Sequence, residues 1–212
     1  MKAFIFDMDG VIIDSEPINT GLAIKTVAHF GKSITSNEME KYAGSTMKVI
    51  FSSIKENKQI NAPLEEIITY MQASMLRNLI ETEIEPIKGI RQLLSNLKTN
   101  NIPTAIASSS PKHIIEAVVD KFKLADYFAH LVSGNEVKHS KPDPEIYLVT
   151  AEKLGVLPNE CVVLEDSTNG VNAAKNAGMT CIGFRNLNSG NQDISRADLI
   201  VDTIGKIDLN KI

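Results

Sequence analysis

Carboxylates, hydroxyls and one lysine follow short apolar segments at four separate points of the sequence. These residues are Asp7 and Asp9, Ser108 and Ser109, Lys141, and Glu165 with Asp166. Carboxylate oxygens are the ligands that Mg²⁺ prefers, and a hydroxyl with a compact ammonium group suits a phosphate dianion. One carboxylate can then attack phosphorus while a second moves protons. The residue types therefore favour phosphoryl transfer with Mg²⁺ as cofactor.

The apolar segments themselves predict the strands of a parallel β-sheet. The expected strands are residues 3–6, 104–107, 130–133, 161–164, 180–184 and 199–201. Strands that alternate with helices are typical of α/β folds, which bind ligands beyond the carboxyl ends of their strands. The sequence therefore predicts an α/β protein with a Rossmann-like parallel sheet core and helices on both faces. The polar residues are expected at one end of that sheet.

The region of residues 15–82 contains no convincing strand pattern. Apolar residues recur there at helical spacing in four stretches. The third of these helices is expected to begin after Thr46, a suitable capping residue, with its apolar side formed by Val49, Ile50 and Ile54. The sequence therefore predicts a small all-α helical domain of residues 15–82, inserted into an α/β core domain of residues 1–14 and 83–212.

The composition is that of a globular protein, with 43% hydrophobic and 23% charged residues. A net charge of −4 gives no electrostatic reason to expect a nucleic acid or an anionic membrane as partner. No apolar run is long enough to span a bilayer, and the first residues predict a core strand rather than a signal peptide. Cys161 and Cys181 are expected to be buried, reduced thiols. We therefore expect a cytoplasmic protein, with a monomer as the default state.

The polar residues stand in the order of the four motifs of the haloacid dehalogenase-like phosphohydrolases, which the whole chain resembles. The motifs are Asp7–Gly10, Ser108, Lys141–Pro142 and Glu165–Ser167. Three longer stretches look like the branch that contains β-phosphoglucomutase and small sugar-phosphate phosphatases. These stretches are Asp14–Pro17, Lys141–Pro144 and Glu165–Met179.

The resemblance implies a role for each polar residue. Asp7 would be the nucleophile, and Asp9 the general acid and base. The phosphate group would be held by Ser108, Ser109 and Lys141, and Mg²⁺ by Asp7, Asp9 through its carbonyl oxygen, Glu165 and Asp166. The inserted helical domain would be a mobile cap that closes over the substrate and excludes water.

Hydrolysis and a mutase reaction are the two main alternatives. The mutases of this branch carry a histidine and two basic residues in the cap, where this sequence has Asn19, Ala43 and Met47. A second phosphate would have little to neutralise it there, although Lys25, Lys48 or Lys112 are possible replacements. The missing charge favours hydrolysis of a small sugar or polyol phosphate. A non-enzymatic phosphoacceptor is a weaker alternative, because Asp9 as an acid and base favours turnover.

The residues that would face the leaving group of the substrate lie in the helical domain. The candidates are Asn19, Tyr42, Ser45, Thr46 and Met47, of which Tyr42 and Met47 suit helix packing equally well. None of the four histidines is assigned a catalytic or metal-binding role.

Overall fold

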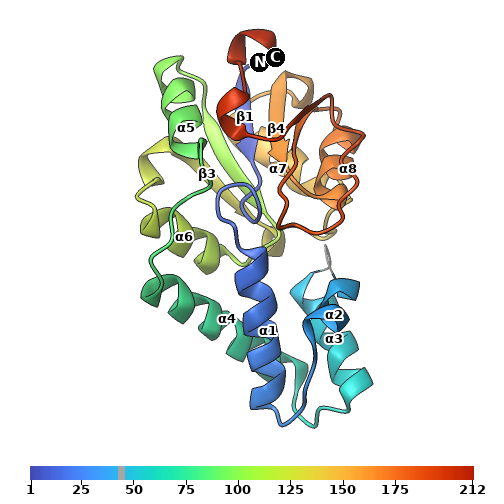
Figure 1. The fold of residues 1–212 in the computed structure, drawn as a ribbon. Helices are drawn as coiled ribbons and strands as arrows, with labels where there is room; N and C mark the ends of the chain where they lie inside the picture. Colours follow the sequence, from blue (N-terminus) through green and yellow to red (C-terminus); the bar gives the residue numbers. More distant parts are fainter. Residues whose placement is uncertain (43–45) are drawn as a thin grey trace. The chain divides into compact units, whose positions relative to one another are not determined.

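The computed structural model describes residues 1–42 and 46–212, apart from the side chain of Glu40. The described residues form two compact units (Figure 1). One comprises Met1–Asp14 and Glu85–Ile212, and the other comprises Ser15–Ile84. We call them the core unit and the helical unit. Ser45, a candidate for facing the substrate, and Ala43 lie outside the described residues.

The core unit is built on a six-stranded sheet in the order β3-β2-β1-β4-β5-β6, and every pair of neighbouring strands is parallel. The strands are β1 Ala3–Phe6, β2 Thr104–Ser108, β3 Phe128–Ser133, β4 Cys161–Glu165, β5 Thr180–Phe184 and β6 Leu199–Val201. The predicted Rossmann-like parallel sheet is therefore confirmed. The strand order reverses beside β1, and such a switch point is where open α/β sheets bind their ligands.

Four α-helices of the core unit pack against this sheet. They are α5 Ile90–Thr99, α6 Lys112–Lys121, α7 Glu145–Leu154 and α8 Thr168–Asn176. Helices α7 and α8 share a buried cluster with alternate residues of the strands, including Ala3 and Ile5 of β1. Figure 1 shows α5 and α6 on the other side of the strands. Covering both faces explains why the central strands are apolar throughout. Cys161 and Cys181 are both free and buried, as expected.

The helical unit contains α1 Glu16–His29, α2 Ser36–Met39, α3 Met47–Lys58 and α4 Leu64–Glu81. As predicted, Thr46 caps α3, because its side chain accepts a hydrogen bond from the backbone N–H of Val49. The expected apolar side of α3 is partly wrong. Phe51 and Ile54 are buried, whereas Val49 is 56% exposed. Val49 lies two positions before Phe51, and residues at that spacing face different sides of a helix.

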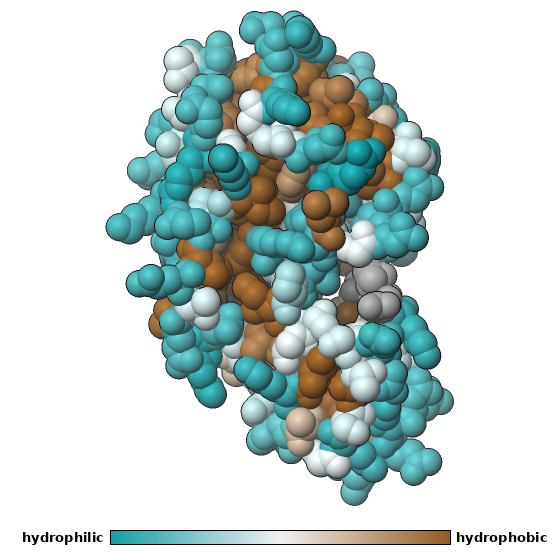
Figure 2. Space-filling model, viewed as in Figure 1, coloured by the Kyte–Doolittle hydropathy of each residue, from teal (hydrophilic) through white to brown (hydrophobic). Residues whose placement is uncertain are grey.

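The surface is mostly polar, and Figure 2 shows hydrophilic residues over much of the visible face. Several large apolar residues are nevertheless exposed, with Leu187 at 89% and Ile80 at 76%. Within the part of the chain that the structure describes, no helix is both long and apolar enough to cross a membrane.

The helical unit has a core of its own, so its stability can be tested on one helix. Replacing the fully buried Ile54 by Ala should lower the free energy of unfolding by about 2–5 kcal/mol, because it removes packed methyl groups and leaves a cavity. Val49→Ala, on the exposed side of the same helix, is the matched control and should change the free energy of unfolding by less than about 0.5 kcal/mol. Urea unfolding followed by circular dichroism measures both. Equal losses in the two variants would contradict the burial described for α3.

Candidate active site

Three buried carboxylates meet where β1 and β4 end. The register pairs Phe6 of β1 with Leu164 of β4, so Asp7 and Glu165 follow on adjacent strands. Asp166 comes next in the chain, and carboxylate oxygens of Asp7, Glu165 and Asp166 lie within 4.8 Å of one another. The sequence predicted these three acids at one end of the sheet, and the structure brings them together at its switch point.

Lys141 is the cation of this cluster. Its Nζ lies 2.6 Å from Oδ1 of Asp7 and 2.7 Å from Oε1 of Glu165. The same Nζ donates to the carbonyl oxygen of Ala107, at the end of β2, over 3.1 Å. Only 6% of the lysine side chain is exposed. Lys141 is therefore fixed by three oxygens that come from three neighbouring strands.

The cluster combines three acids with one cation, Lys141, and its pKa values are shifted accordingly. Burial raises the pKa of Asp7 to about 8, with Lys141 opposing that shift and Glu165 adding to it. Burial also raises the pKa of Asp166 well above its usual range, and the charge of Glu165 adds to this effect. Glu165 is different, since Lys141 overcomes the effect of burial and lowers the pKa of Glu165. Three ionised carboxylates beside one ammonium group leave two negative charges, which a divalent cation would balance.

Protein donors occupy both oxygens of Glu165. Oε1 accepts from Lys141 and from the hydroxyl of Tyr147, at 2.7 and 2.8 Å. Oε2 accepts from the backbone N–H groups of Asp166 and Ser167 and from the Ser167 hydroxyl, each at 3.0 Å. Asp7 and Asp166 have fewer such donors, although the hydroxyl of Ser189 donates to Asp166. A cation therefore has better access to Asp7 and Asp166 than to Glu165.

Asp9 lies beside the serines at the end of β2. Its Oδ2 accepts from the hydroxyl of Ser110 at 2.8 Å and from that of Ser108 at 3.4 Å. The carbonyl of Ser110 in turn accepts from Ser133 of β3. Ser109, which the sequence suggested as a phosphate ligand, is exposed, and Ser110 is the neighbour that contacts Asp9. The strand ends of β1, β2 and β3 thus meet around the Asp9 carboxylate.

Two glycines leave room for the carboxylates. Gly10 has a φ of +76°, which favours glycine, and a Cβ there would lie 1.9 Å from Oδ2 of Asp166. A Cβ on Gly170 of α8 would lie 1.7 Å from Oε1 of Glu165. Both glycines are therefore required by the close approach of an acid.

Sequence reasoning missed three supporting residues, namely Tyr147, Ser110 and Ser189. Tyr147 is fully buried, and its ring lies 4.9 Å from Nζ of Lys141. Its place on the apolar side of α7 gave no sign of a polar contact. Ser110 could have been found from the run of three serines after β2. Ser189 belongs to a polar loop that only the fold brings to Asp166.

The candidates for facing the substrate have contacts within the helical unit. Thr46 caps α3, and the hydroxyl of Tyr42 accepts from Ser53 at 3.4 Å. Tyr42 and Met47 also pack against the apolar core of this unit. Asn19 is half-buried on α1. The role of these residues toward a substrate stays a prediction.

Fold and site together define a Rossmann-like α/β protein whose acids and lysine meet at the switch point of the sheet. The model of the haloacid dehalogenase-like hydrolase family matches residues 4–184. The chain therefore belongs to that family, as its motifs predicted.

Several known proteins are similar to the chain over most of its length. Hexitol phosphatase B of Escherichia coli is 35% identical over 181 residues, which cover 85% of this chain and 82% of that protein. A phosphorylated carbohydrates phosphatase of Thermotoga maritima is 35% identical over 179 residues, covering 84% and 82%. The crystal structure of CbbY from Rhodobacter sphaeroides in complex with phosphate has a TM-score of 0.91 and 25% identity, and the match covers 97% of this chain and 96% of that one.

The buried lysine should be essential for the stability of the core unit. Lys141→Met leaves Asp7 and Glu165 without their common cation and should lower the free energy of unfolding by about 3 kcal/mol. Lys153→Met removes a surface ion pair with Glu136 and should cost less than about 1 kcal/mol. Urea unfolding without added metal measures both variants. A Lys141→Met protein as stable as the Lys153→Met control would show that the charges are not coupled as described.

Proposed function

We propose that the protein is a Mg²⁺-dependent phosphatase that hydrolyses a small phosphorylated sugar or polyol through an aspartyl phosphate on Asp7. The observation that carries this proposal is the meeting of three buried acids around the single cation Lys141, with the hydroxyl of Ser108 beside Asp9. A buried site of that kind suits a dication together with a phosphate group. The printed names of the relatives, a hexitol phosphatase and a phosphorylated carbohydrates phosphatase, support the substrate class.

The donor set fits Mg²⁺. Asp7 and Asp166 would bind the ion with their carboxylates and Asp9 with its main-chain carbonyl, while Glu165 would act mainly through its hold on Lys141. When bound, the ion supplies positive charge beside the phosphate oxygens and thereby favours attack by an anionic carboxylate.

The residues of the chain can then carry out two displacement steps. A carboxylate oxygen of Asp7 attacks phosphorus, the bond from phosphorus to the ester oxygen breaks, and Asp9 donates a proton to the departing alcohol. In the second step Asp9 takes a proton from water, the water oxygen attacks phosphorus, and the bond to Asp7 breaks. Inorganic phosphate leaves, and both carboxyl groups return to their first state. Lys141 and Ser108 would hold the phosphate throughout.

The hydrogen bonds of Asp9 support its role as acid and base. Two hydroxyl groups, on Ser108 and Ser110, fix its carboxylate at the end of β2. Ser110 is itself anchored by Ser133. A proton-transfer group needs such a fixed position relative to the ester oxygen.

The helical unit would serve as the cap. Closure of such a unit excludes water, and Asn19, Tyr42, Thr46 and Met47 would contribute to the choice of leaving group. Hydrolysis remains favoured over a mutase reaction, because Asn19 and Met47 offer no charge to a second phosphate. Lys112, one possible replacement, already donates to the carbonyl of Leu131.

The proposal takes the protein to be a cytoplasmic monomer that acts on a small molecule. The net charge of −4 supports the absence of nucleic-acid and membrane partners, and the buried free thiols of Cys161 and Cys181 support a reducing compartment.

Metal binding should depend on pH. Burial raises the pKa of Asp7 from its ordinary value of 3.8 to about 8 in the folded protein. Between these two pH values the folded protein binds the proton more tightly than the unfolded chain, so its free energy of unfolding falls as the pH rises. Mg²⁺ binds the ionised carboxylates, so the rise in melting temperature on adding Mg²⁺ should grow across the same range. Thermal unfolding in Mg²⁺ and in EDTA measures this difference.

Asp7→Asn should flatten the pH dependence of the Mg²⁺ effect, and Asp120→Asn on the exposed face of α6 should not. A constant Mg²⁺ effect at every pH would contradict the site.

Phosphate release is the direct test of function. We expect turnover of hexitol and hexose phosphates with Mg²⁺, and no turnover in EDTA. Asp7→Asn should lower kcat by at least about 10³-fold through loss of the nucleophile. Asp9→Asn should lower it by about 10²–10⁴-fold through loss of proton transfer. The exposed Asp120→Asn is again the control. The measurement is inorganic phosphate released from a panel that also contains nucleotides and p-nitrophenyl phosphate.

Two outcomes would overturn this function. Interconversion of β-glucose 1-phosphate and glucose 6-phosphate faster than phosphate release would make the protein a mutase. Stable labelling of Asp7 without turnover would make it a phosphoacceptor.

A further inference from the structure

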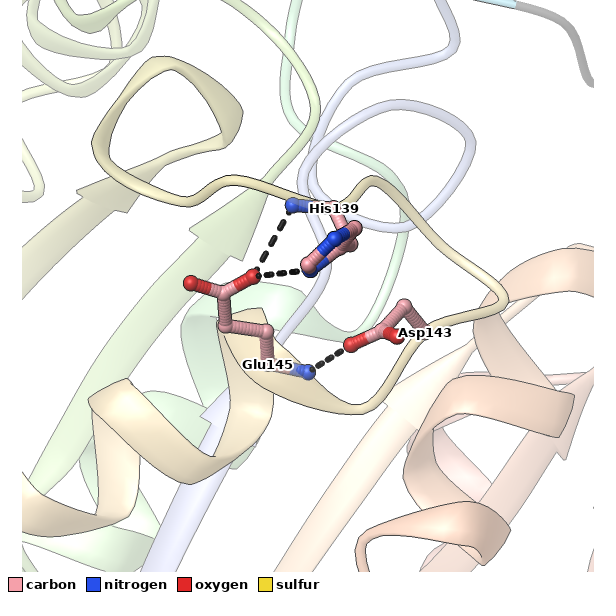
Figure 3. Close-up of side chains that lie close together, drawn as sticks. All are labelled: His139, Asp143 and Glu145. Carbon is pink, nitrogen blue, oxygen red and sulfur yellow. Dashed lines mark hydrogen bonds and ion pairs between the residues drawn. The ribbon is translucent and has the colours of Figure 1, made fainter.

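A second cluster of possible metal ligands lies at the start of α7 (Figure 3). It consists of His139, Asp143 and Glu145, whose ligand atoms lie within 4.8 Å of one another. Backbone donors already use most of these atoms. Glu145 accepts from the N–H of Lys138 and of His139, and Oδ1 of Asp143 accepts from the N–H of Glu145 over 3.0 Å. The cluster is therefore explained without an ion.

We propose that Glu145 is a positioning residue for Lys141, because its carboxylate clamps the loop that carries the lysine. This inference rests on the proposed function only for its effect on catalysis. The clamp itself concerns only the position of the loop of residues 138–144.

The clamp closes on the residues just before Lys141. Both carboxylate oxygens of Glu145 accept from the N–H of Lys138 at 3.1 Å, and Oε2 also accepts from the N–H of His139 at 2.9 Å. The ring of His139 lies 3.1 Å from the same Oε2 through Nδ1 (Figure 3). One side chain thus fixes two consecutive peptide groups. Lys141 follows two residues after His139, so the position of these peptide groups determines where Nζ of Lys141 can lie.

Further contacts hold the loop after Lys141. The N–H of Asp143 donates to the carbonyl of Ser140 over 3.1 Å, and Asn176 of α8 donates to the carbonyl of Pro142 over 3.2 Å. Lys141 therefore lies between two fixed points. Its buried ammonium group lies 2.6 Å from Asp7 and 2.7 Å from Glu165, so a shift of the loop by about 1 Å would weaken both contacts.

The charge of Glu145 is needed for this arrangement. An ionised carboxylate accepts at both oxygens, and hydrogen bonds that N–H groups donate to a charged acceptor are stronger than those donated to a neutral one. The N–H groups of Lys138 and His139 accordingly lower the pKa of Glu145. Glu145 is also the first residue of α7, where negative charge is favoured. A glutamine has one acceptor oxygen and would turn its NH₂ group toward backbone donors.

The first turn of α7 thereby supports Lys141 from two sides. Glu145 fixes the backbone of the loop. Tyr147, two residues later, contacts the ammonium group of Lys141 with its ring, and its hydroxyl donates to Oε1 of Glu165, which also accepts from Lys141. No other described contact of Glu145 reaches the acid cluster, so its effect on the cluster must pass through the loop.

The test compares Glu145→Gln with Glu152→Gln, an exposed glutamate on the same helix. The first readout is the rate at which acetic anhydride modifies each lysine of the full chain, followed by mass spectrometry. Lys141 is almost fully buried, so its modification should be slow in the parent protein and at least about fivefold faster in Glu145→Gln. Lys153, on α7, is the internal reference and should not change. Glu145→Asp should restore part of the protection.

The second readout concerns phosphate. In Glu145→Gln the inhibition constant of inorganic phosphate and the KM for p-nitrophenyl phosphate should rise at least about fivefold, with a smaller change in kcat. Glu152→Gln should match the parent in both. A merely structural role would not produce this selective change in phosphate affinity.

The outcomes separate the clamp from the function. Unchanged modification of Lys141 in Glu145→Gln would overturn the clamp, and so would an equal increase at all lysines, which indicates general unfolding. A parent protein that does not hydrolyse p-nitrophenyl phosphate would count against the proposed function, while the modification rates would still decide the clamp.

Discussion

The buried contact of Lys141 with Asp7 and Glu165 is the interaction on which the rest of the site depends. Two carboxylates and an ammonium group are costly to bury, and they are tolerated only when each is paired and hydrogen-bonded. The fold meets this condition by making β1 and β4 neighbours, so that Asp7 and Glu165 stand side by side. Tyr147 and the N–H groups after Glu165 complete its hydrogen bonds. The strand order thus allows one lysine to contact both acids.

The same charges explain local features of the sequence that look unrelated. Gly10 follows Asp9 because the turn brings its Cα against the carboxylate of Asp166. Gly170 lies in the first turn of α8 because Glu165 occupies the space of a side chain there. Ser167 both caps α8 and donates to Glu165. Glycine and serine at these positions are therefore consequences of packing an acid cluster against backbone, and a helix or turn considered by itself would not require them.

The sequence predicted the sheet and the main site residues because both depend on local signals. Apolar segments give the strands, and polar residues directly after them fall at one end of a parallel sheet. Contacts made by packing could not be predicted in this way. Tyr147 looked like an ordinary core residue of α7, and only its position against Glu165 makes its hydroxyl important. Ser110, and not Ser109, contacts Asp9, because the chain turns between the two serines. Val49 faces solvent because α3 buries the side that carries Phe51.

The proposed function would divide two tasks between the two units. All the acids, the lysine and the serines of the site belong to the core unit. Under the proposed function, binding of the phosphate group would therefore fall to the core unit. Selection of the alcohol to which the phosphate is attached would then depend on other side chains. Under the proposed function, a change of leaving group would call for substitutions in the helical unit, since substitutions around Lys141 would disturb the buried charges.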